Sequence, residues 1–414
     1  MLRSSAPYLV FWTARGERIP ARTRSLFERY FTDVAADSGQ ANDVFGVLRQ
    51  YYDRAGFADY RQAFDARRQV IVDRQTYPPR DPTGCPDVAS AYPTCISDIQ
   101  VQSELQRLIA AKRLPTAGPL APAYAGGELA RAAPVYFVVV PADVNLCQIG
   151  GTVCLDKNMC GYHHAFSDHG NAVLFAAISI QTHGKGVATS GRFRNQLVRW
   201  PKVCQGDNRK PAQEPNRDAG DVMISLLSHE DSEMITDPLF TSWVVYGATK
   251  SESVLSEVGD RCNFWGSFDP VNGTNPRAYA PTLGGRAAAG TLYDQLINGH
   301  RYYTQSEWSN GDGNCEMRPS PGRIIPRFTA PRRPVRAGQS LRFNPATSRS
   351  RRPLSSATWQ FGDGSPTAFF PASAALTSVK HRFRKPGRHI VTLTLVDSAG
   401  NLKSTNRLVT VRRR

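Results

Sequence analysis

The sequence lacks several features that define common classes of protein. Among its 414 residues, no apolar stretch approaches the roughly 18 residues that a bilayer-spanning helix needs. We therefore expect no transmembrane segment. No two cysteines have CxxC spacing, which excludes a zinc-ribbon arrangement. Residues 8–12 are apolar but too few for the hydrophobic region of a secretory signal, so we interpret them as a first strand.

Acidic residues are nearly absent from the last part of the chain. From Arg323 to Arg414 there are 19 lysines and arginines but two acids, Asp363 and Asp397, which gives a net charge of +17. The other 32 basic and 33 acidic residues lie in the first 322 positions. The overall charge of +16 therefore belongs to the C-terminal part, and this separation predicts two modules.

The eight cysteines form an even set, which favours disulfides and an oxidising, extracellular compartment. We expect Cys85 to pair with Cys95, and Cys262 with Cys315. Sequence alone leaves the pairing of the other four open, namely Cys147, Cys154, Cys160 and Cys204. Reduced, buried thiols in a cytosolic protein are the alternative interpretation.

Residues 1–318 alternate between strand and helix patterns, which predicts an α/β module with a mixed sheet, flanking helices and disulfide-stapled loops. The β-branched and aromatic run 135–140 suits a central strand that is buried on both faces. The expected strands are 8–12, 135–140 and 172–180. One expected helix begins at Pro20, and three others span 42–53, 98–112 and 221–236. Residues 246–313 are rich in glycine and asparagine and are expected to be mostly loop.

Residues 319–334 alternate proline with arginine, which predicts a semi-rigid linker that overlaps the start of a module at 324–414. In that module, short alternating strands separated by turn residues predict a β-sandwich. The stretch Trp359-Gln-Phe-Gly-Asp-Gly364, followed by 391–400, resembles a PKD domain, an immunoglobulin-like sandwich common in secreted proteins. Asp363 lies between two glycines, where we interpret it as a turn residue that binds local backbone N–H groups.

The densest group of polar residues is the helix pattern that ends at Pro238. In a helix each residue advances about 100°, so His229, Glu230, Glu233 and Asp237 lie within about 100° of one another on one face. Carboxylates near a helix C-terminus oppose the helix dipole, and a cation beside them would compensate for this.

The motif His229-Glu230-x-x-Glu233 differs by one residue from the HExxH of zinc peptidases. By the same chemistry, His229 and Glu233 bind a divalent metal and Glu230 acts as the base. The third ligand is Asp237, or Glu257 or Asp260 from a later segment. Glutamate in place of the second histidine makes Ca²⁺ or Mn²⁺ possible beside Zn²⁺. The alternative is a surface helix with ordinary charges.

A second cluster contains His163, His164 and His169. Adjacent histidines on a loop can supply a ligand or a general acid. The alternative is that these imidazoles are exposed or bound to backbone groups.

Four short motifs of the N-terminal module occur in one order along the chain: Cys160-Gly-Tyr-His163, Thr236-Asp-Pro238, Glu257-Val-Gly-Asp-Arg-Cys262 and Asn298-Gly-His-Arg-Tyr-Tyr303. In these motifs the module resembles the secreted EXORDIUM, or phosphate-induced protein, family. It implies an extracellular or cell-wall location. Plant members largely lack the His-Glu pair of the helix, whereas microbial relatives often have it, so the plant role is not carried over.

These observations favour a secreted, metal-dependent, peptidase-like hydrolase whose basic PKD module binds an anionic polysaccharide, wall polymer or cell surface. The alternative is a non-enzymatic secreted protein of the cell wall, or one that binds carbohydrate or protein, with a structural metal such as Ca²⁺ or no metal. Nucleic acid is not an expected partner, because the basic module lacks the interleaved aromatic residues of such surfaces.

Overall fold

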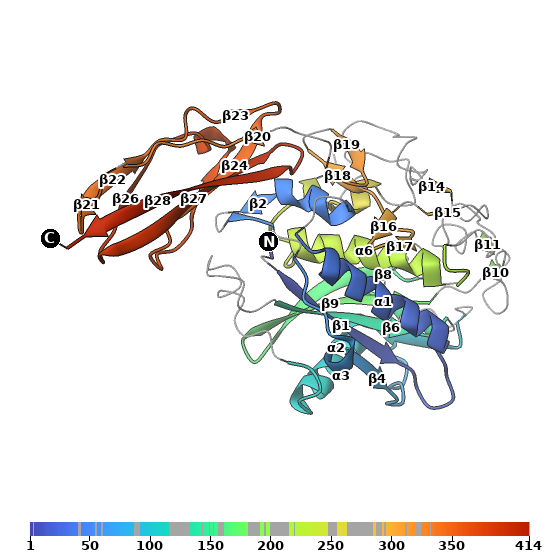
Figure 1. Ribbon diagram of the computed structural model, residues 1–414. Helices are drawn as coiled ribbons and strands as arrows, with labels where there is room; N and C mark the ends of the chain where they lie inside the picture. The colour runs from blue at the N-terminus through green and yellow to red at the C-terminus, as the bar shows by residue number, and fades with distance from the viewer. Residues whose placement is uncertain are drawn as a thin grey trace.

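A computed structural model gives the arrangement of the chain (Figure 1). The residues that it describes are 1–2, 4–39, 43–53, 56–58, 61–86, 92–115, 133–142, 144–148, 150–151, 153–155, 161–180, 191–193, 196–198, 215–218, 220–246, 255–262, 285–286, 292–293, 295–310, 313–319, 324–331 and 333–413.

A five-stranded sheet in the order β4-β1-β6-β9-β8 forms the centre of the N-terminal module. Its strands are β1 (Ser5–Trp12), β4 (Val70–Asp73), β6 (Ala133–Val140), β8 (Gly161–Asp168) and β9 (Asn171–Ser179). Strands β4, β1, β6 and β9 run parallel, and β8 lies antiparallel to β9 at one edge. The mixed sheet expected from the sequence is therefore present, with the three expected strands as β1, β6 and β9.

Helices cover both faces of this sheet (Figure 1). Helices α1 (Ala21–Asp37) and α6 (Gly220–Thr236), with the 3₁₀ helix η1 (Val44–Gln50), pack on one face. Helix α3 (Asp98–Ala110) packs on the other, and the short α2 (Ala66–Gln69) precedes β4. Because side chains alternate along a strand, Phe137 and Val139 of β6 face α1 and α6, while Tyr136 and Val138 face α3.

Small paired elements surround this core. They are β2 (Tyr52–Asp53) with β3 (Gly56–Phe57), β5 (Thr94–Ser97) with β7 (Val144–Cys147), β10 (Gly191–Phe193) with β11 (Gln196–Val198), β12 (Val245–Tyr246) with β13 (Leu255–Ser256), β14 (Gly285–Arg286) with β15 (Leu292–Tyr293), β16 (Gln295–Ile297) with β17 (His300–Tyr302), β18 (Glu307–Ser309) with β19 (Asn314–Glu316), and the 3₁₀ helix η3 (Asp260–Cys262). Within the described part of the chain, no helix is both long enough and apolar enough to cross a bilayer.

Disulfides join the outer segments of the N-terminal module. Cys85 is bonded to Cys95 and Cys262 to Cys315, as expected from the sequence. The structure also bonds Cys147 to Cys154, two of the four cysteines whose pairing the sequence left open. The other two, Cys160 and Cys204, lie outside the described residues.

The C-terminal module is a β-sandwich. One sheet has the order β21-β28-β27-β24-β25, and the opposing strands pair as β22 with β26 and β20 with β23. The elements are β20 (Ile324–Ile325), β21 (Val335–Arg336), β22 (Ser340–Phe343), β23 (Arg349–Ser350), β24 (Leu354–Gln360), β25 (Ala368–Pro371), η4 (Ala372–Ala374), β26 (Val379–Arg382), β27 (Gly387–Asp397) and β28 (Leu402–Arg412). Trp359 is fully buried in its core and contacts Phe328, Phe343 and Phe361.

The two modules meet where the turn after β27 packs on η1. Gly400 has a φ of +82°, and an added Cβ there would lie 2.9 Å from the carbonyl oxygen of Gly46. A side chain at position 400 would therefore be strained in its backbone and would collide with η1.

The N-cap of η1 is a buried carboxylate. Asp43 Oδ1 accepts a hydrogen bond of 3.2 Å from the backbone N–H of Gly46, while Oδ2 has no hydrogen-bond partner among the described residues. Burial raises the pKa of Asp43 to about 7, against the smaller lowering effect of the Gly46 N–H. The protonated form is thus favoured in the folded state, so its contribution to stability is full at low pH and is lost as the pH rises through about 7.

We therefore predict that Asp43→Asn changes stability in a pH-dependent way. An amide keeps the Gly46 cap and carries no charge, so the variant should be close to wild type near pH 4 and more stable by about 2–4 kcal/mol at pH 8. Thermal unfolding at both pH values measures the difference. An equal effect at the two pH values would contradict the account.

Candidate metal centre

Helix α6 supplies three side chains of the centre, namely those of His229, Glu230 and Glu233. Every residue from Met223 to Pro238 is buried, because α6 lies between the sheet, α1, η1 and the β18 segment. The interpretation of this helix as a surface helix with ordinary charges is therefore wrong. Buried carboxylates need a compensating partner, and the neighbours of these residues show what that partner is.

Glu233 is the hub of the centre. Its Oε2 lies 3.2 Å from His229 Nε2 and 3.4 Å from His163 Nδ1, and its Oε1 accepts a hydrogen bond of 3.0 Å from the backbone N–H of Asp260. Burial alone would raise the pKa of Glu233, but the two imidazoles hold it well below its ordinary value. Burial lowers the pKa of His229, and the carboxylates around it raise that pKa by more, to well above the usual range.

His163 reaches the centre from β8, the edge strand of the sheet. The expectation that His163 and His164 lie on a loop is wrong, because both belong to a regular strand that pairs with β9. His163 Nδ1 lies 3.4 Å from Glu230 Oε2, and Nε2 lies 3.6 Å from Glu257 Oε1. Its ring stacks nearly parallel on Phe240, with centroids 4.7 Å apart. A residue of the second histidine cluster thus joins the helix motif.

A short segment around Gly259 closes the centre. Asp260 Oδ1 lies 3.8 Å from His229 Nε2. An added Cβ on Gly259 would lie 2.7 Å from His229 Nδ1 and 3.1 Å from Glu233 Oε1, so the backbone itself packs against the two side chains. Glu257, two residues earlier, faces His163.

This segment is held from outside by the strand region that follows β17. Gln305 donates a hydrogen bond of 2.7 Å from Nε2 to the Gly259 carbonyl, and the Trp308 N–H donates one of 3.0 Å to the Val258 carbonyl. The Arg261 guanidinium lies 3.9 Å from the centroid of the Trp308 ring. Together with the Cys262–Cys315 disulfide, these contacts fix Asp260 against α6.

The centre contains more carboxylates than imidazoles. Burial raises the pKa of Glu257 to about 9 and that of Asp260 to about 7, with Glu233 as a further cause in both cases. Burial also raises the pKa of Glu307, on β18, well above its ordinary value. Burial is the main reason that these carboxyl groups favour their neutral form, and a neighbouring cation would favour the ionised form instead.

In this centre, two sets of side chains have ligand atoms within 4.8 Å of one another: His229, Glu233 and Asp260, and His163, Glu230 and Glu233. They share Glu233. Two ligands about 2.0–2.1 Å from a tetrahedral zinc ion lie about 3.3 Å apart, and the separations from His229 to Glu233 and Asp260 are 3.2 and 3.8 Å. The 3.2 Å separation suits two ligands of one ion and also a direct ion pair between His229 and Glu233, whereas the 3.8 Å separation is longer than either.

Four of the residues predicted from the sequence lie outside these sets, namely Asp237, Glu257, His164 and His169. Of these, Glu257 borders the centre, with its Oε1 3.6 Å from His163 Nε2. Asp237 follows the end of α6, and its Oδ1 accepts two hydrogen bonds of 2.7 Å from the backbone N–H groups of Thr241 and Ser242. Asp237 thus orders the turn after the helix. His164 points to the opposite face of the sheet, where its Nδ1 lies 3.2 Å from Asp98 Oδ2.

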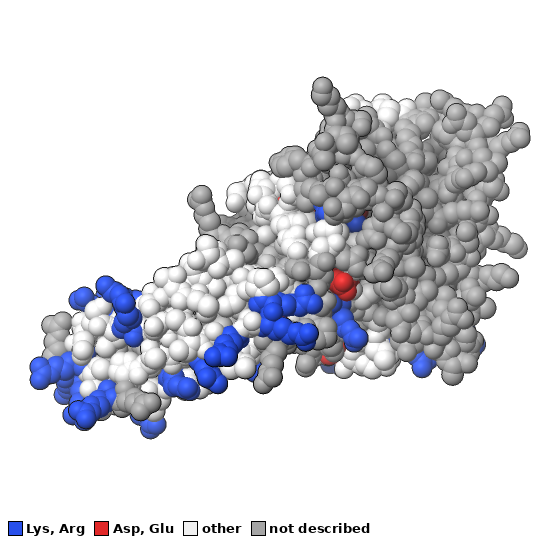
Figure 2. Space-filling view, turned by 90° about the horizontal axis from the view of Figure 1, so that it is seen from above, with Lys and Arg blue, Asp and Glu red and all other residues white. Residues whose placement is uncertain are grey.

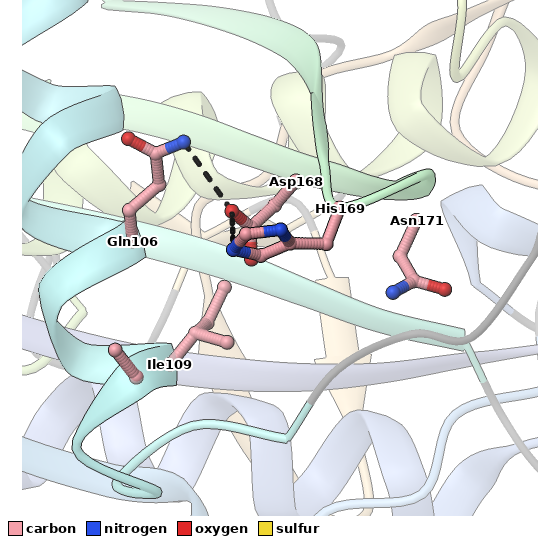
Figure 3. A pocket seen from close by; sticks show the side chains of 6 residues that line it. Gln106, Ile109, Asp168, His169 and Asn171 are labelled. Carbon is pink, nitrogen blue, oxygen red and sulfur yellow. Dashed lines mark hydrogen bonds and ion pairs between the residues drawn. The ribbon is translucent and has the colours of Figure 1, made fainter.

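His169 occupies the turn between β8 and β9, with a side chain that is 94% exposed. It lines a separate pocket of about 390 Å³ with Gln106, Asp168 and Asn171 (Figure 3). Gln106 Nε2 donates a hydrogen bond of 3.3 Å to Asp168 Oδ1 there. This pocket lies beside α3, on the other side of the sheet from α6.

Sequence reasoning missed Glu307, Gly259 and Gln305. Each acts through a contact between segments that are distant in the chain, and no local motif marks them. For Gly259, a useful signal was its place between the candidate ligands Glu257 and Asp260, since a glycine there allows close approach of the backbone.

A model described as "PKD domain" matches residues 325–411, which shows a PKD domain in this part of the chain. The PKD1 domain of Vibrio anguillarum Epp is 20% identical, covers 22% of this chain and 95% of that chain, and has a TM-score of 0.18. The PKD1 domain of the Vibrio cholerae metalloprotease PrtV is 22% identical, with coverages of 22% and 93% and a TM-score of 0.16.

Over a longer range, wild type OgpA from Akkermansia muciniphila is 9% identical, covers 99% of this chain and 95% of that chain, and has a TM-score of 0.24. A TM-score this low carries no argument about fold or function. No curated protein matches the chain.

We predict that Gly259→Ala weakens metal binding, because the new Cβ pushes His229 and Glu233 apart. The expected loss is at least about tenfold in affinity, or about 1.4 kcal/mol, measured by competition with a chelating dye. Gly170→Ala is the control: it has a φ of +82° and open space, so it should lower stability without changing affinity. Equal metal affinities of Gly259→Ala and wild type would contradict the geometry.

Proposed function

We propose that the chain is a metal-dependent hydrolase in which His229, Glu233 and Asp260 hold a divalent cation. The observation that carries the proposal is the convergence of these three ligand atoms, from α6 and from the Gly259 segment, within 4.8 Å of one another. The donors fit such an ion. One imidazole nitrogen and two carboxylate oxygens are ligands that divalent cations bind. Beside this set, His163 Nε2 and Glu257 Oε1 are buried without a hydrogen bond among the described residues, and they form an ion pair of 3.6 Å with each other.

The donor set favours a transition metal such as Zn²⁺ over Ca²⁺. Imidazole is a common ligand of zinc, whereas calcium prefers a shell made of oxygen ligands. A cation here would favour the ionised forms of Glu257 and Asp260, whose pKa values burial raises. Asp260 lies on the side of the centre that is nearest to solvent, because its side chain is 34% exposed.

The chemistry proposed is hydrolysis with Glu230 as general base. A bound divalent ion supplies Lewis acidity toward a scissile carbonyl and increases the acidity of water. Glu230 follows His229 directly on α6 and points to the same group of side chains, so its carboxylate can accept the proton of the attacking water. His163 contacts Glu230 Oε2 and thereby orients the base.

A polypeptide substrate is supported by the position of β8. This strand is at the edge of the sheet and carries His163. In the described part of the chain, no backbone hydrogen bond joins the outer edge of β8 to another segment. An extended chain can pair with such an edge by adding a strand, which would place its peptide bonds beside Glu230.

We further propose an extracellular location and attachment through the PKD domain to an anionic surface. The support is the PKD match, the disulfides and the net charge of the last 92 residues. The resemblance of the N-terminal module to the EXORDIUM family agrees with this location and stays a prediction. The alternative function is a non-enzymatic surface protein with a structural ion, which the deep burial of His229 and Glu233 favours.

We predict that purified protein binds about one equivalent of a divalent metal. Inductively coupled plasma mass spectrometry after dialysis measures this. His229→Ala should remove the metal. Glu230→Gln should keep it and lower the hydrolysis of an unfolded protein such as casein by about 10²–10⁴-fold. No metal in the wild type would contradict the proposal.

If the Glu230→Gln variant retains full hydrolytic activity, Glu230 is not the general base. A metal that changes the melting temperature, in a protein that hydrolyses no substrate, would select the structural alternative. The conservative Glu230→Gln change makes this distinction because it removes a charge without removing volume.

A further inference from the structure

The outward face of the β22–β26 pair in the PKD domain consists of charged and small polar side chains. In this antiparallel pair Arg342 lies directly opposite Lys380, and Ser340 lies opposite Arg382. All four are exposed, while their neighbours Leu341 and Phe343 point into the sandwich core. Opposing residues in an antiparallel pair have Cβ atoms about 4.5–5.5 Å apart, so two cations are held side by side.

A second pair of like charges lies next to the first. Arg336 of β21 is the partner of Arg412 of β28, and both are exposed. The turn from Arg336 to Ser340 connects β21 directly to β22, with a hydrogen bond of 3.2 Å from the Gln339 N–H to the Arg336 carbonyl. We name Arg336, Arg342, Lys380, Arg382 and Arg412 the basic tip.

The basic tip lies at the end of the PKD domain that is remote from the N-terminal module, where β21, β22 and the end of β28 come together (Figure 1). In the space-filling view, Lys and Arg side chains gather at this end of the molecule and along one border of the same domain (Figure 2). A partner bound there does not approach α6.

No acid of the PKD domain neutralises the basic tip. Asp363 is bound by Ser365 and lies 2.8 Å from His381 Nε2, and Asp397 is buried and accepts hydrogen bonds from Ala399 and Asn401. Among the described residues, none of the five basic side chains forms an ion pair. Like charges directly opposite each other destabilise a strand pair, so this arrangement lowers the stability of the isolated domain.

We infer that the basic tip is a binding site for a linear anionic polysaccharide, whose carboxylate or sulfate groups supply the missing counter-charges. This inference gives a place and a ligand class to the proposed attachment role and is independent of the metal centre. On β26, Lys380 and Arg382 occupy alternate positions and are therefore about 6.6–6.8 Å apart along the strand. Arg342 lies opposite Lys380, so three cations are grouped on one face and suit a charged chain. The outward positions Ser340, Arg342, Lys380 and Arg382 include no apolar or aromatic side chain, which surfaces that bind membranes or single-stranded nucleic acid commonly use.

The test compares two double variants of the full-length protein that lose the same charge. Arg342→Gln with Lys380→Gln changes the basic tip, and Arg349→Gln with Arg351→Gln changes exposed arginines at β23. The probes are polygalacturonate, heparin, phosphatidylserine-containing vesicles and duplex DNA, each at several salt concentrations. We expect the tip variant to bind both polysaccharides at least about tenfold more weakly and with a smaller salt dependence. The β23 variant should stay within about twofold of wild type.

Equal weakening by the two variants would overturn the basic tip as the site, because net charge alone would then explain binding. Stronger binding of wild type to vesicles or DNA than to either polysaccharide would overturn the ligand class. Failure of wild type to bind any of the probes would remove the attachment role altogether. The melting temperature of the tip variant should equal or exceed that of wild type, so weaker binding is not a result of unfolding.

Discussion

The N-terminal module depends on one electrostatic constraint, the burial of Glu233 between two imidazoles. A carboxylate is expensive to bury without a partner. His229 supplies the first partner from the same helix, and His163 supplies the second from β8. To bring both within contact, α6 must pack on the sheet face beside its edge strand, and the Gly259 segment must come close enough for Asp260 to donate its N–H to Glu233. The cluster thus links helix, sheet and disulfide-bonded segment.

The sequence predicts the helix that carries this centre better than it predicts which residues meet there. The helix expected at 221–236 is α6 (Gly220–Thr236), because its apolar spacing and Pro238 are signals contained in a few turns of chain. The contribution of His163 could not be found in that way, since it depends on the antiparallel pairing of β8 with β9. The sequence also does not show that two adjacent histidines point to opposite faces of a sheet until the segment is known to be a strand. The strand sends His163 toward Glu233 and His164 toward Asp98.

Asp237 was predicted as a ligand, but the structure gives it another role. Its position one turn after Glu233 suggested a ligand, but Pro238 ends the helix and the carboxylate binds the N–H groups of Thr241 and Ser242 instead.

In the C-terminal module, alternation and turn residues predicted the sandwich well, because the pattern of apolar residues in each strand indicates which of its faces is buried. The pairing of Arg342 with Lys380 and of Arg336 with Arg412 required the register of the strands. Net charge could be read from the sequence, but the basic tip could not.

The central proposal is that His229, Glu233 and Asp260 bind a divalent ion. The most direct measurement is anomalous X-ray scattering at the zinc absorption edge from crystals of the zinc-loaded protein. The account predicts one strong peak about 2.0–2.2 Å from His229 Nε2 and from oxygens of Glu233 and Asp260. A map with no peak among these side chains, in which His229 and His163 keep their direct contacts with Glu233, would contradict it.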